Sequence, residues 1–308
     1  RIVRMLRNVQ VDWMKWDFNV DLGSGAWAPT LPKRLIGQAP LVAHYHGLYR
    51  MQDAIRATFP DLILEMCAGG GGRMDGEILS HAHVNWISDE IGALRKLAIH
   101  VGTQLNHPAV VCNDWLVDWA GSGNDEAEIK DPRGDLAFRL RVAMLGSFGI
   151  SARIDRWPAA DIDVVADHIA LYKDKLRPII HHGDQYYMTQ PPPPDGNGDW
   201  AAIWYLAKGA SAGVLFAFRL AGTGSGRVFR LPGLLPESQY RVSYMSGETA
   251  MTTGAELNMG LTIKLPERFR SELCLIEAVT DRHVYGGKTA PGAEQPPANS
   301  GASSDFPG

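Results

Sequence analysis

Positive charge, cysteine and long apolar runs are all scarce in this 308-residue sequence, and each scarcity excludes a class of protein. Lys and Arg number 30 against 34 Asp and Glu, and the resulting net charge of −4 provides no basic surface for nucleic acid. No run of about 18 apolar residues is present, so we expect no segment that spans a membrane. Cys67, Cys112 and Cys274 are too few for a disulfide framework and do not have the spacing of a zinc site.

The chain also lacks an initiator methionine and a signal peptide. Ile2, Val3, Met5, Leu6 and Val9 already form a helical pattern that leads into a strand, so we expect the chain to begin inside a βα repeat, as a fragment would. A targeting segment would belong to a preceding part, and the sequence therefore indicates no compartment.

The first expected strand, residues 11–19, ends in alternating aromatic and polar side chains. Lys15, Asp17 and Asn19 should share one face, because successive side chains of a strand point to opposite faces. A cation close to a carboxylate favours its ionised form. An ionised carboxylate at the end of a strand, beside Trp16, has the character of a glycosidase nucleophile; the alternative interpretation is an ion pair on an edge strand.

Strands and helices alternate through the first 190 residues. The apolar periodicity predicts strands at 11–19, 61–67 and 84–89, a short strand mixed with a Trp-rich loop at 101–119, and helices at 41–59, around 91–98, at 136–147 and at 161–177. This alternation is typical of a parallel α/β barrel, whose active sites lie at the C-terminal ends of the strands. We expect residues 1–190 to form about half of a (β/α)8 barrel.

The composition changes at the proline run 191–194. Short apolar segments separated by turns follow, and the predicted strands are 200–207, 213–220, 227–231, 239–245, 260–265 and 272–279. We therefore expect an antiparallel, β-sandwich-like domain over residues 191–285. Residues 286–308, rich in Gly, Ala, Pro and Ser, are expected to be a disordered tail.

The strand at 61–67 runs through Cys67 into four glycines, Gly69–Gly72. Glycines let a backbone approach a ligand closely, or they simply allow a tight turn. A phosphate-binding loop would need Gly-Lys-Ser/Thr at the end of the run, where this chain has Arg73. We expect Arg73 and Asp75 to form a structural ion pair instead.

Two carboxylates, Asp17 and Asp89, end two strands of the expected barrel. Retaining glycosidases place two carboxyl groups about 5–5.5 Å apart, one as nucleophile and one as acid/base. Lys15 would keep Asp17 ionised, as a nucleophile requires. Trp86 would provide an apolar wall that raises the pKa of Asp89, as an acid requires.

Four ordered motifs resemble those of glycoside hydrolase family 36, the microbial α-galactosidases or melibiases. They are Lys15-Trp16-Asp17-Phe18-Asn19, Tyr45-His46-Gly47-Leu48-Tyr49-Arg50, Cys67 to Asp75, and Trp86-Ile87-Ser88-Asp89. The resemblance covers roughly residues 1–280. It implies a retaining double displacement with Asp17 as nucleophile and Asp89 as acid/base, and galactose contacts from Lys15, Cys67 and Gly69. Asn19 and Trp86 complete the predicted substrate-binding set.

The chain departs from the family pattern at two places. Gly92 stands where the family usually has an aspartate, three residues after the acid, and residues 111–114 replace a Met-Gly-Ala-His stretch. Both departures bear on substrate preference. We expect Asp114 and Asp118 on a solvated rim, with a role in a substrate subsite as the alternative.

Several functions stay open at this point. The first is a retaining α-galactosidase; others are an α-N-acetylgalactosaminidase, an α-galactosyl-transferring enzyme, or an inactive carbohydrate-binding fragment. The expected partner is an oligosaccharide or galactoside, without nucleic acid or membrane, and a homo-oligomer stays open. No cofactor or metal is expected, because the two HxH pairs, His44/His46 and His81/His83, have no Cys or carboxylate to complete a ligand set.

Overall fold

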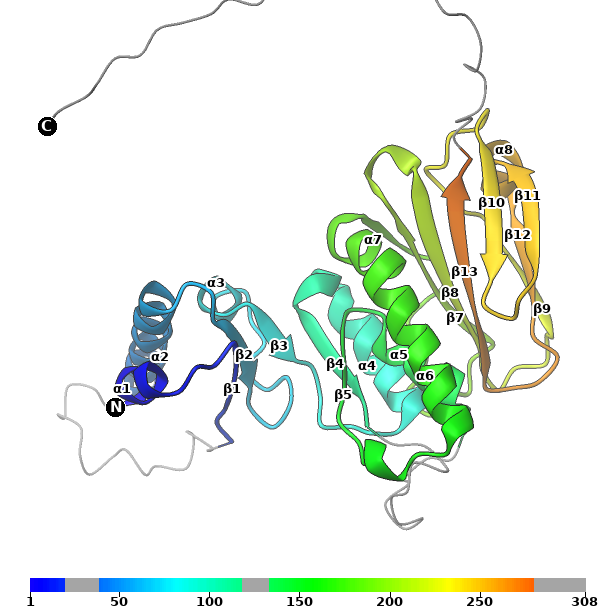
Figure 1. Ribbon diagram of the computed structural model, residues 1–308. Coiled ribbons are helices and arrows are strands. Elements are labelled where there is room, and N and C mark those ends of the chain that lie inside the picture. The colour runs from blue at the N-terminus through cyan, green and yellow to red at the C-terminus, as the bar shows by residue number, and fades with distance from the viewer. Residues whose placement is uncertain (20–38, 118–132, 280–308) are drawn as a thin grey trace, which may run out of the picture. The chain divides into compact units, whose positions relative to one another are not determined.

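The computed structural model describes residues 1–19, 39–117 and 133–279, and Arg1–Ala278 form one compact unit. Its first half is built on a parallel sheet of five strands (Figure 1). In sheet order the strands are β1 (Trp13–Asp17), β2 (Ile63–Cys67), β3 (Val84–Trp86), β4 (Cys112–Leu116) and β5 (Ser147–Ile150). The order along the sheet equals the order along the chain, as expected of consecutive βα units.

Helices connect these strands. They are α1 (Ile2–Asn8), α2 (Ala39–Thr58), α3 (Ile78–His81), α4 (Ala93–Gln104) and α5 (Leu136–Ala143). Apolar side chains fix them to the sheet: Leu6 of α1 and Ile55 of α2 pack with Leu62 just before β2, and α4 buries Leu94, Leu97 and Val101. The predicted strands and helices of this part are confirmed, except that the helix expected at 136–147 ends at Ala143 and β5 follows it.

A long helical segment closes the first half. α6 (Ala159–Leu171) continues through a five-residue π-helical turn (Tyr172–Leu176) into α7 (Arg177–His182). The helix predicted at 161–177 is confirmed and is longer than expected. Short 3₁₀ turns at Ala109–Val111 and Ile154–Arg156 complete the helical elements of this part in the described ranges.

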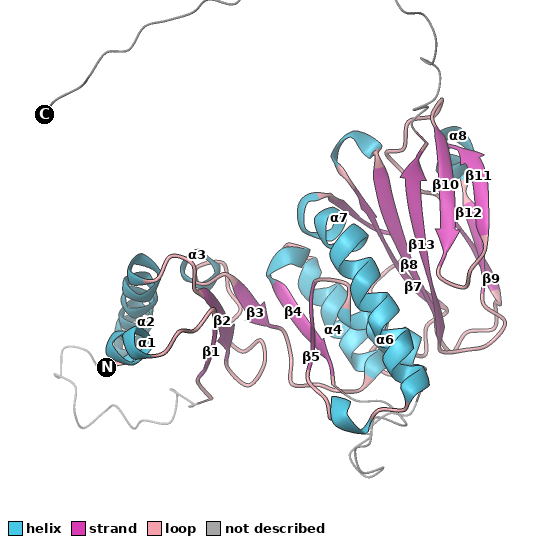
Figure 2. Ribbon diagram, in the orientation of Figure 1, coloured by secondary structure: helices cyan, strands magenta, loops and turns pink. Residues whose placement is uncertain are grey.

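The second half is antiparallel (Figure 2). A six-stranded sheet has the order β11-β10-β13-β8-β7-β6, and β9 pairs with β12 in a separate two-stranded sheet. The strands are β6 (Asp184–Tyr187), β7 (Trp200–Leu206), β8 (Ala212–Arg219), β9 (Gly226–Phe229), β10 (Gln239–Tyr244), β11 (Thr249–Thr253), β12 (Leu261–Lys264) and β13 (Arg270–Ala278). The six predicted strands are confirmed; β6, β11 and helix α8 (Gly254–Met259) were not predicted.

The six-stranded sheet has a core on each face. On β8, Phe216 and Phe218 pack with the helices of the first half, whereas Leu215 and Ala217 pack with Phe229 and the two-stranded sheet. This alternation has the period of two that a strand imposes. One sheet therefore serves as a common wall for the helical layer and the outer strands. The domain boundary at 190/191 stays a prediction, and residues 286–308 lie outside the described residues.

The helical layer contains a neutral histidine that makes stability sensitive to acid. Tyr172 donates its hydroxyl to the carbonyl of Gly146 (2.6 Å) and lies 3.1 Å from His181 Nε2. Burial, and then the positive charges of His182 and Arg177, lower the pKa of His181 from 6.5 to about 4.

We expect the chain to lose stability as the pH falls from 6.5 towards 4. In that window His181 stays neutral in the fold but binds a proton in the unfolded chain, so acid favours unfolding. For this half-buried side chain the loss is about 1–2 kcal/mol after allowance for solvent screening. Chemical denaturation of His181→Gln should show a shallower acid decline than the wild type, whereas His46→Gln, at an exposed position away from His181, should not. Parallel pH curves for wild type and His181→Gln would contradict this assignment.

Candidate active site

The carboxyl ends of β1, β2 and β3 bring most of the predicted site residues to one edge of the parallel sheet. Asp17 is the last residue of β1 and lies opposite Cys67, the last residue of β2. Asp89 follows β3 by three residues. Parallel strands end at the same edge, so the chain order alone gathers these side chains.

Cys67 and Asp17 interact directly. The thiol is buried, and burial raises the pKa of Cys67 to about 11; the Gly70 backbone N–H and Lys15 act against that rise, and a hydrogen bond with Asp17 adds to it. The thiol therefore stays protonated at neutral pH, beside the exposed side chain of its register partner Asp17. This protonation state makes Cys67 unsuited to act as a nucleophile.

Lys15 is held by two tryptophans. Its ammonium lies 4.4 Å from the ring centroid of Trp86 and 4.6 Å from that of Trp115, and the two rings are 4.5 Å apart. Such contacts between a cation and aromatic faces are attractive. The two indole rings thus hold the Lys15 ammonium through cation–π contacts. The influence of Lys15 on the ionisation of Asp17 stays a prediction.

Trp86 makes a polar contact with Asp89, in addition to the apolar wall that the sequence predicts. Its indole Nε1 donates a hydrogen bond of 2.7 Å to Asp89 Oδ1. Only Trp among the apolar aromatic residues carries such a donor, so this contact fixes the orientation of the carboxyl group. The separation between Asp17 and Asp89 stays a prediction.

The glycine run fits tightly between β1 and β3. The amide of Gly69 donates to Asn19 Oδ1, which ties the loop to the end of β1. A Cβ on Gly70, whose φ is +82°, would lie 2.8 Å from Ser88 Cα, and one on Gly71 would lie 2.8 Å from the carbonyl oxygen of Ile87. The glycines are therefore required for close packing against the segment that carries Asp89.

The expected Arg73–Asp75 ion pair is wrong. Asp75 Oδ1 instead accepts hydrogen bonds from the amides of Glu77 and Ile78 at the start of α3, both at 2.9 Å. The buried guanidinium of Arg73 lies 4.6 Å from the ring centroid of Phe18. Sequence reasoning gave Arg73 the wrong partner, because Phe18 is far away from it in the sequence.

The segment after Asp89 shows how the chain accommodates Gly92. Glu90 Oε1 accepts hydrogen bonds from the amides of Ile91 (3.0 Å) and Gly92 (2.9 Å), and Gly92 is the N-cap of α4. A carboxylate next to Asp89 thus satisfies amides at the beginning of the helix, where negative charge is favourable.

The solvated rim predicted for Asp114 is wrong. Its side chain is fully buried on the helix side of β4, with Oδ1 2.6 Å from Lys96 Nζ and Oδ2 3.7 Å from His100 Nδ1. Burial alone would raise the pKa of Asp114, but Lys96 and His100 together hold it below its usual value. Asp118 lies outside the described residues.

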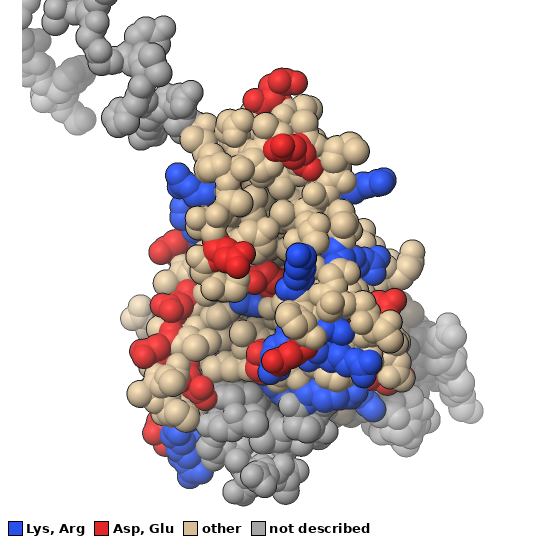
Figure 3. Space-filling model, turned by 90° about the vertical axis from the view of Figure 1, so that its right-hand side faces the viewer, with Lys and Arg blue, Asp and Glu red and all other residues tan. Residues whose placement is uncertain are grey.

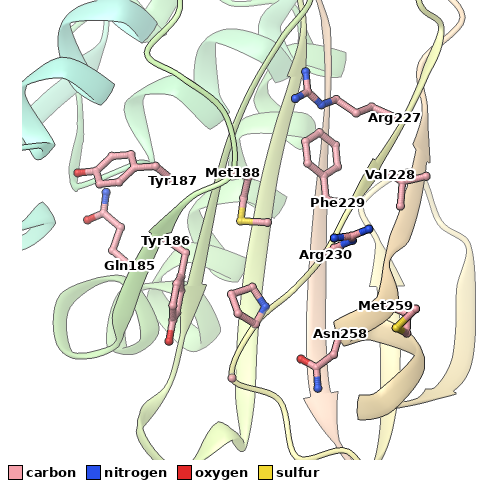
Figure 4. A pocket seen from close by; sticks show the side chains of 12 residues that line it. Gln185, Tyr186, Tyr187, Met188, Arg227, Val228, Phe229, Arg230, Asn258 and Met259 are labelled. Atoms are coloured by element: carbon pink, nitrogen blue, oxygen red, sulfur yellow. The ribbon is translucent and has the colours of Figure 1, made fainter.

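A separate groove of 1290 Å³ lies in the antiparallel half, between β6 and β9 (Figure 4). Its walls include Tyr186 and Met188 on one side and Arg227, Arg230 and Met259 on the other. The lining residues come from the second half of the chain, whereas the predicted site residues come from the parallel sheet, so the groove and the candidate site are distinct.

The described ranges show no metal-binding cluster and no membrane-spanning helix. No group of three or more His, Cys, Asp and Glu that could hold a metal ion occurs there, and no helix there is long and apolar enough to cross a membrane. On the face shown in Figure 3, Lys and Arg side chains lie among Asp and Glu side chains.

Known proteins that are similar in sequence to this chain are α-galactosidases. α-Galactosidase 2 of Hypocrea jecorina is 28% identical over 283 residues, which are 90% of this chain and 34% of that protein. α-Galactosidase C of Emericella nidulans is 29% identical over 89% of this chain and 33% of its own length. The chain thus spans about a third of the curated relatives it matches.

Solved structures show the same fold. The family 36 α-galactosidase AgaA of Geobacillus stearothermophilus matches with a TM-score of 0.75 and 27% identity, over 90% of this chain and 37% of that one. Variants of AgaA have been solved in complex with raffinose and with stachyose.

The family resemblance drawn from the four motifs is confirmed at the level of the family. The melibiase family model matches residues 1–183, which include β1 to β5 and all the predicted site residues. The chain belongs to the melibiase family.

Proposed function

We propose that this chain supplies the nucleophile and the acid/base of a retaining α-galactosidase, and that its five parallel strands are the C-terminal part of a (β/α)8 barrel. One observation carries the proposal: two carboxylates lie at the ends of different strands at the same edge of the parallel sheet. Asp17 lies opposite Cys67 in the register of β1 and β2, and Asp89 accepts a hydrogen bond from the Trp86 indole.

The two carboxylates take complementary roles in a double displacement. Asp17 attacks the anomeric carbon of the galactosyl group as the bond to the leaving oxygen breaks, and Asp89 gives that oxygen a proton. A water then attacks the galactosyl ester of Asp17 while Asp89 takes the proton back. Each cycle adds one water across the glycosidic bond and returns both residues to their starting state.

The remaining residues fit the binding of a sugar. Lys15 on its two tryptophans, the Asn19–Gly69 contact and the Cys67 thiol provide polar groups around Asp17. Trp86 contributes an aromatic ring to the same place. Since AgaA variants were solved with raffinose and stachyose, we propose oligosaccharides ending in α-galactose as substrates.

The stereochemistry of the first product tests the mechanism. The complete gene product that contains this chain is mixed with an aryl α-galactoside, and anomeric protons are followed by NMR. A double displacement should release α-galactose first, with β-galactose appearing only by mutarotation. Initial release of β-galactose would contradict the proposed roles, and absence of hydrolysis would favour the alternative of a carbohydrate-binding protein.

We also expect a preference for galactose over N-acetylgalactosamine of at least ~100-fold in kcat/KM, about 3 kcal/mol. The buried Cys67 side chain at the site edge should clash with an acetamido group at the sugar 2-position, and close-packed sites accept added atoms poorly. The measurement is kcat/KM on the aryl α-galactoside and on the matched aryl α-N-acetylgalactosaminide. Equal rates would show that the substitutions at Gly92 and 111–114 have widened the pocket.

A further inference from the structure

The tryptophans beside Asp89 are backed by a buried ion cluster that the proposed reaction does not use. Lys96 of α4 and Asp114 of β4 have side chains that are 7% and 0% exposed and lie 2.6 Å apart. His100, one helical turn after Lys96, is fully buried next to Asp114. These three side chains form the Lys96 cluster.

Stability alone is a poor explanation for such a cluster. Removing two charges from water costs free energy that their mutual attraction recovers only with very good geometry, and an apolar pair of similar volume is often at least as stable. Here the geometry is incomplete, because Asp114 Oδ2 and both ring nitrogens of His100 have no hydrogen-bond partner. The role of the Lys96 cluster is therefore indicated by the other groups that the Lys96 ammonium contacts.

The ammonium contacts both tryptophans of the site. Lys96 Nζ donates a hydrogen bond to the backbone carbonyl of Trp115. This bond fixes the backbone of β4 at the residue that carries the indole ring. The same nitrogen lies 5.9 Å from the ring centroid of Trp86. Trp86 in turn packs on Trp115 and donates its indole N–H to Asp89. A continuous set of contacts thus runs from the buried cluster to the proposed acid/base.

We propose that Lys96 is a positioning residue for Asp89. Asp114 holds its ammonium in place, and the ammonium fixes the pair of tryptophans. Trp86 then presents its N–H so that the Asp89 carboxyl is oriented towards the leaving oxygen. The inference rests on the proposed function, since it assumes that Asp89 is the proton donor.

The test uses a variant that removes both charges. Substitution of Lys96 alone would leave the Asp114 carboxylate buried without a partner and would endanger folding. Lys96→Met with Asp114→Asn keeps the side-chain lengths and removes the pair. A matched control is Lys175→Met with Glu277→Gln, which removes a partly exposed Lys–Glu pair of 2.8 Å far along the chain.

Two substrates separate positioning of the acid from a structural defect. Raffinose has a poor leaving group that needs a proton, whereas 2,4-dinitrophenyl α-galactoside does not, and general acid catalysis contributes about 10²–10⁴-fold. In the complete gene product we expect kcat/KM for raffinose to fall at least ~30-fold and that for the aryl substrate less than ~3-fold. The control pair should change neither. Loss by the same factor on both substrates would overturn the proposal.

A second variant keeps the proposal testable if the first does not fold. Trp86→Phe keeps an aromatic ring at the position beside Lys15 and removes the indole donor to Asp89. It should show the same bias against raffinose, and an unbiased loss in this variant would also overturn the inference. Failure of the proposed function would give a different result. The wild type would not hydrolyse α-galactosides, or Asp89→Ala would lose the same activity on raffinose and on the aryl substrate.

Discussion

Asp17→Ala should abolish turnover of an aryl α-galactoside, and added azide should restore it in part with β-galactosyl azide as the product. Loss of a covalent nucleophile is expected to cost at least ~10³-fold in kcat. The truncated side chain leaves room beside Cys67 at the exposed end of β1, where azide can attack the anomeric carbon directly. A single displacement at that position inverts the α-linkage and gives the β-azide.

Asp89→Ala should give the opposite anomer. An activated leaving group departs without a proton, so the galactosyl ester of Asp17 still forms. Azide then replaces water in the second step and yields α-galactosyl azide. The matched control is Asp12→Ala, an exposed carboxylate just before β1, which should leave the rate unchanged. Reversed azide products would exchange the proposed roles of Asp17 and Asp89.

Periodicity was enough to predict most of the fold, and its failures have local causes. β5 was missed because Met144 and Leu145, fully buried after α5, extend the apolar pattern of the helix into the strand. β11 was missed because most of its residues are exposed and give no apolar alternation. α8 begins with a capping box: the Thr253 side chain accepts a hydrogen bond from the Glu256 amide, and the Glu256 side chain accepts one from the Thr253 amide. This short-range signal for a helix start was present in the sequence.

The candidate site was predictable where its partners are near in sequence or belong to strand ends. The register that places Asp17 beside Cys67 follows from two parallel strands that end together. Pairings between distant elements could not be foreseen, and Asp114 is the example. Tryptophan neighbours suggested a rim, but Lys96 and His100 on α4 approach it from the other face of the sheet. A single sequence does not show which face of a short strand is covered by a helix.

Gly71→Ala should lower kcat/KM by about 10²-fold or more, because an error of about 1 Å in a catalytic group costs that much. The φ of Gly71 is not positive, so backbone strain plays no part and the effect comes from space alone. The added methyl would lie 2.8 Å from the carbonyl oxygen of Ile87, a backbone atom two residues before Asp89. The backbone there is also bonded to β4, since the Ile87 amide donates to the Asn113 carbonyl at 3.3 Å, so the clash must displace either the glycine loop or the segment that carries Asp89.

Gly76→Ala is the matched control for this prediction. It adds the same methyl group in the same connection, at an exposed position where no atom lies within 4 Å of the new Cβ. Both variants of the complete gene product are compared by circular dichroism, thermal unfolding and kinetics on raffinose and an aryl α-galactoside. Gly76→Ala should match the wild type throughout. Gly71→Ala should retain its fold and lose activity on both substrates, because displacement of the glycine loop also moves the Asn19–Gly69 contact beside Asp17. A folded Gly71→Ala protein with wild-type rates would show that the glycine loop does not position either carboxylate.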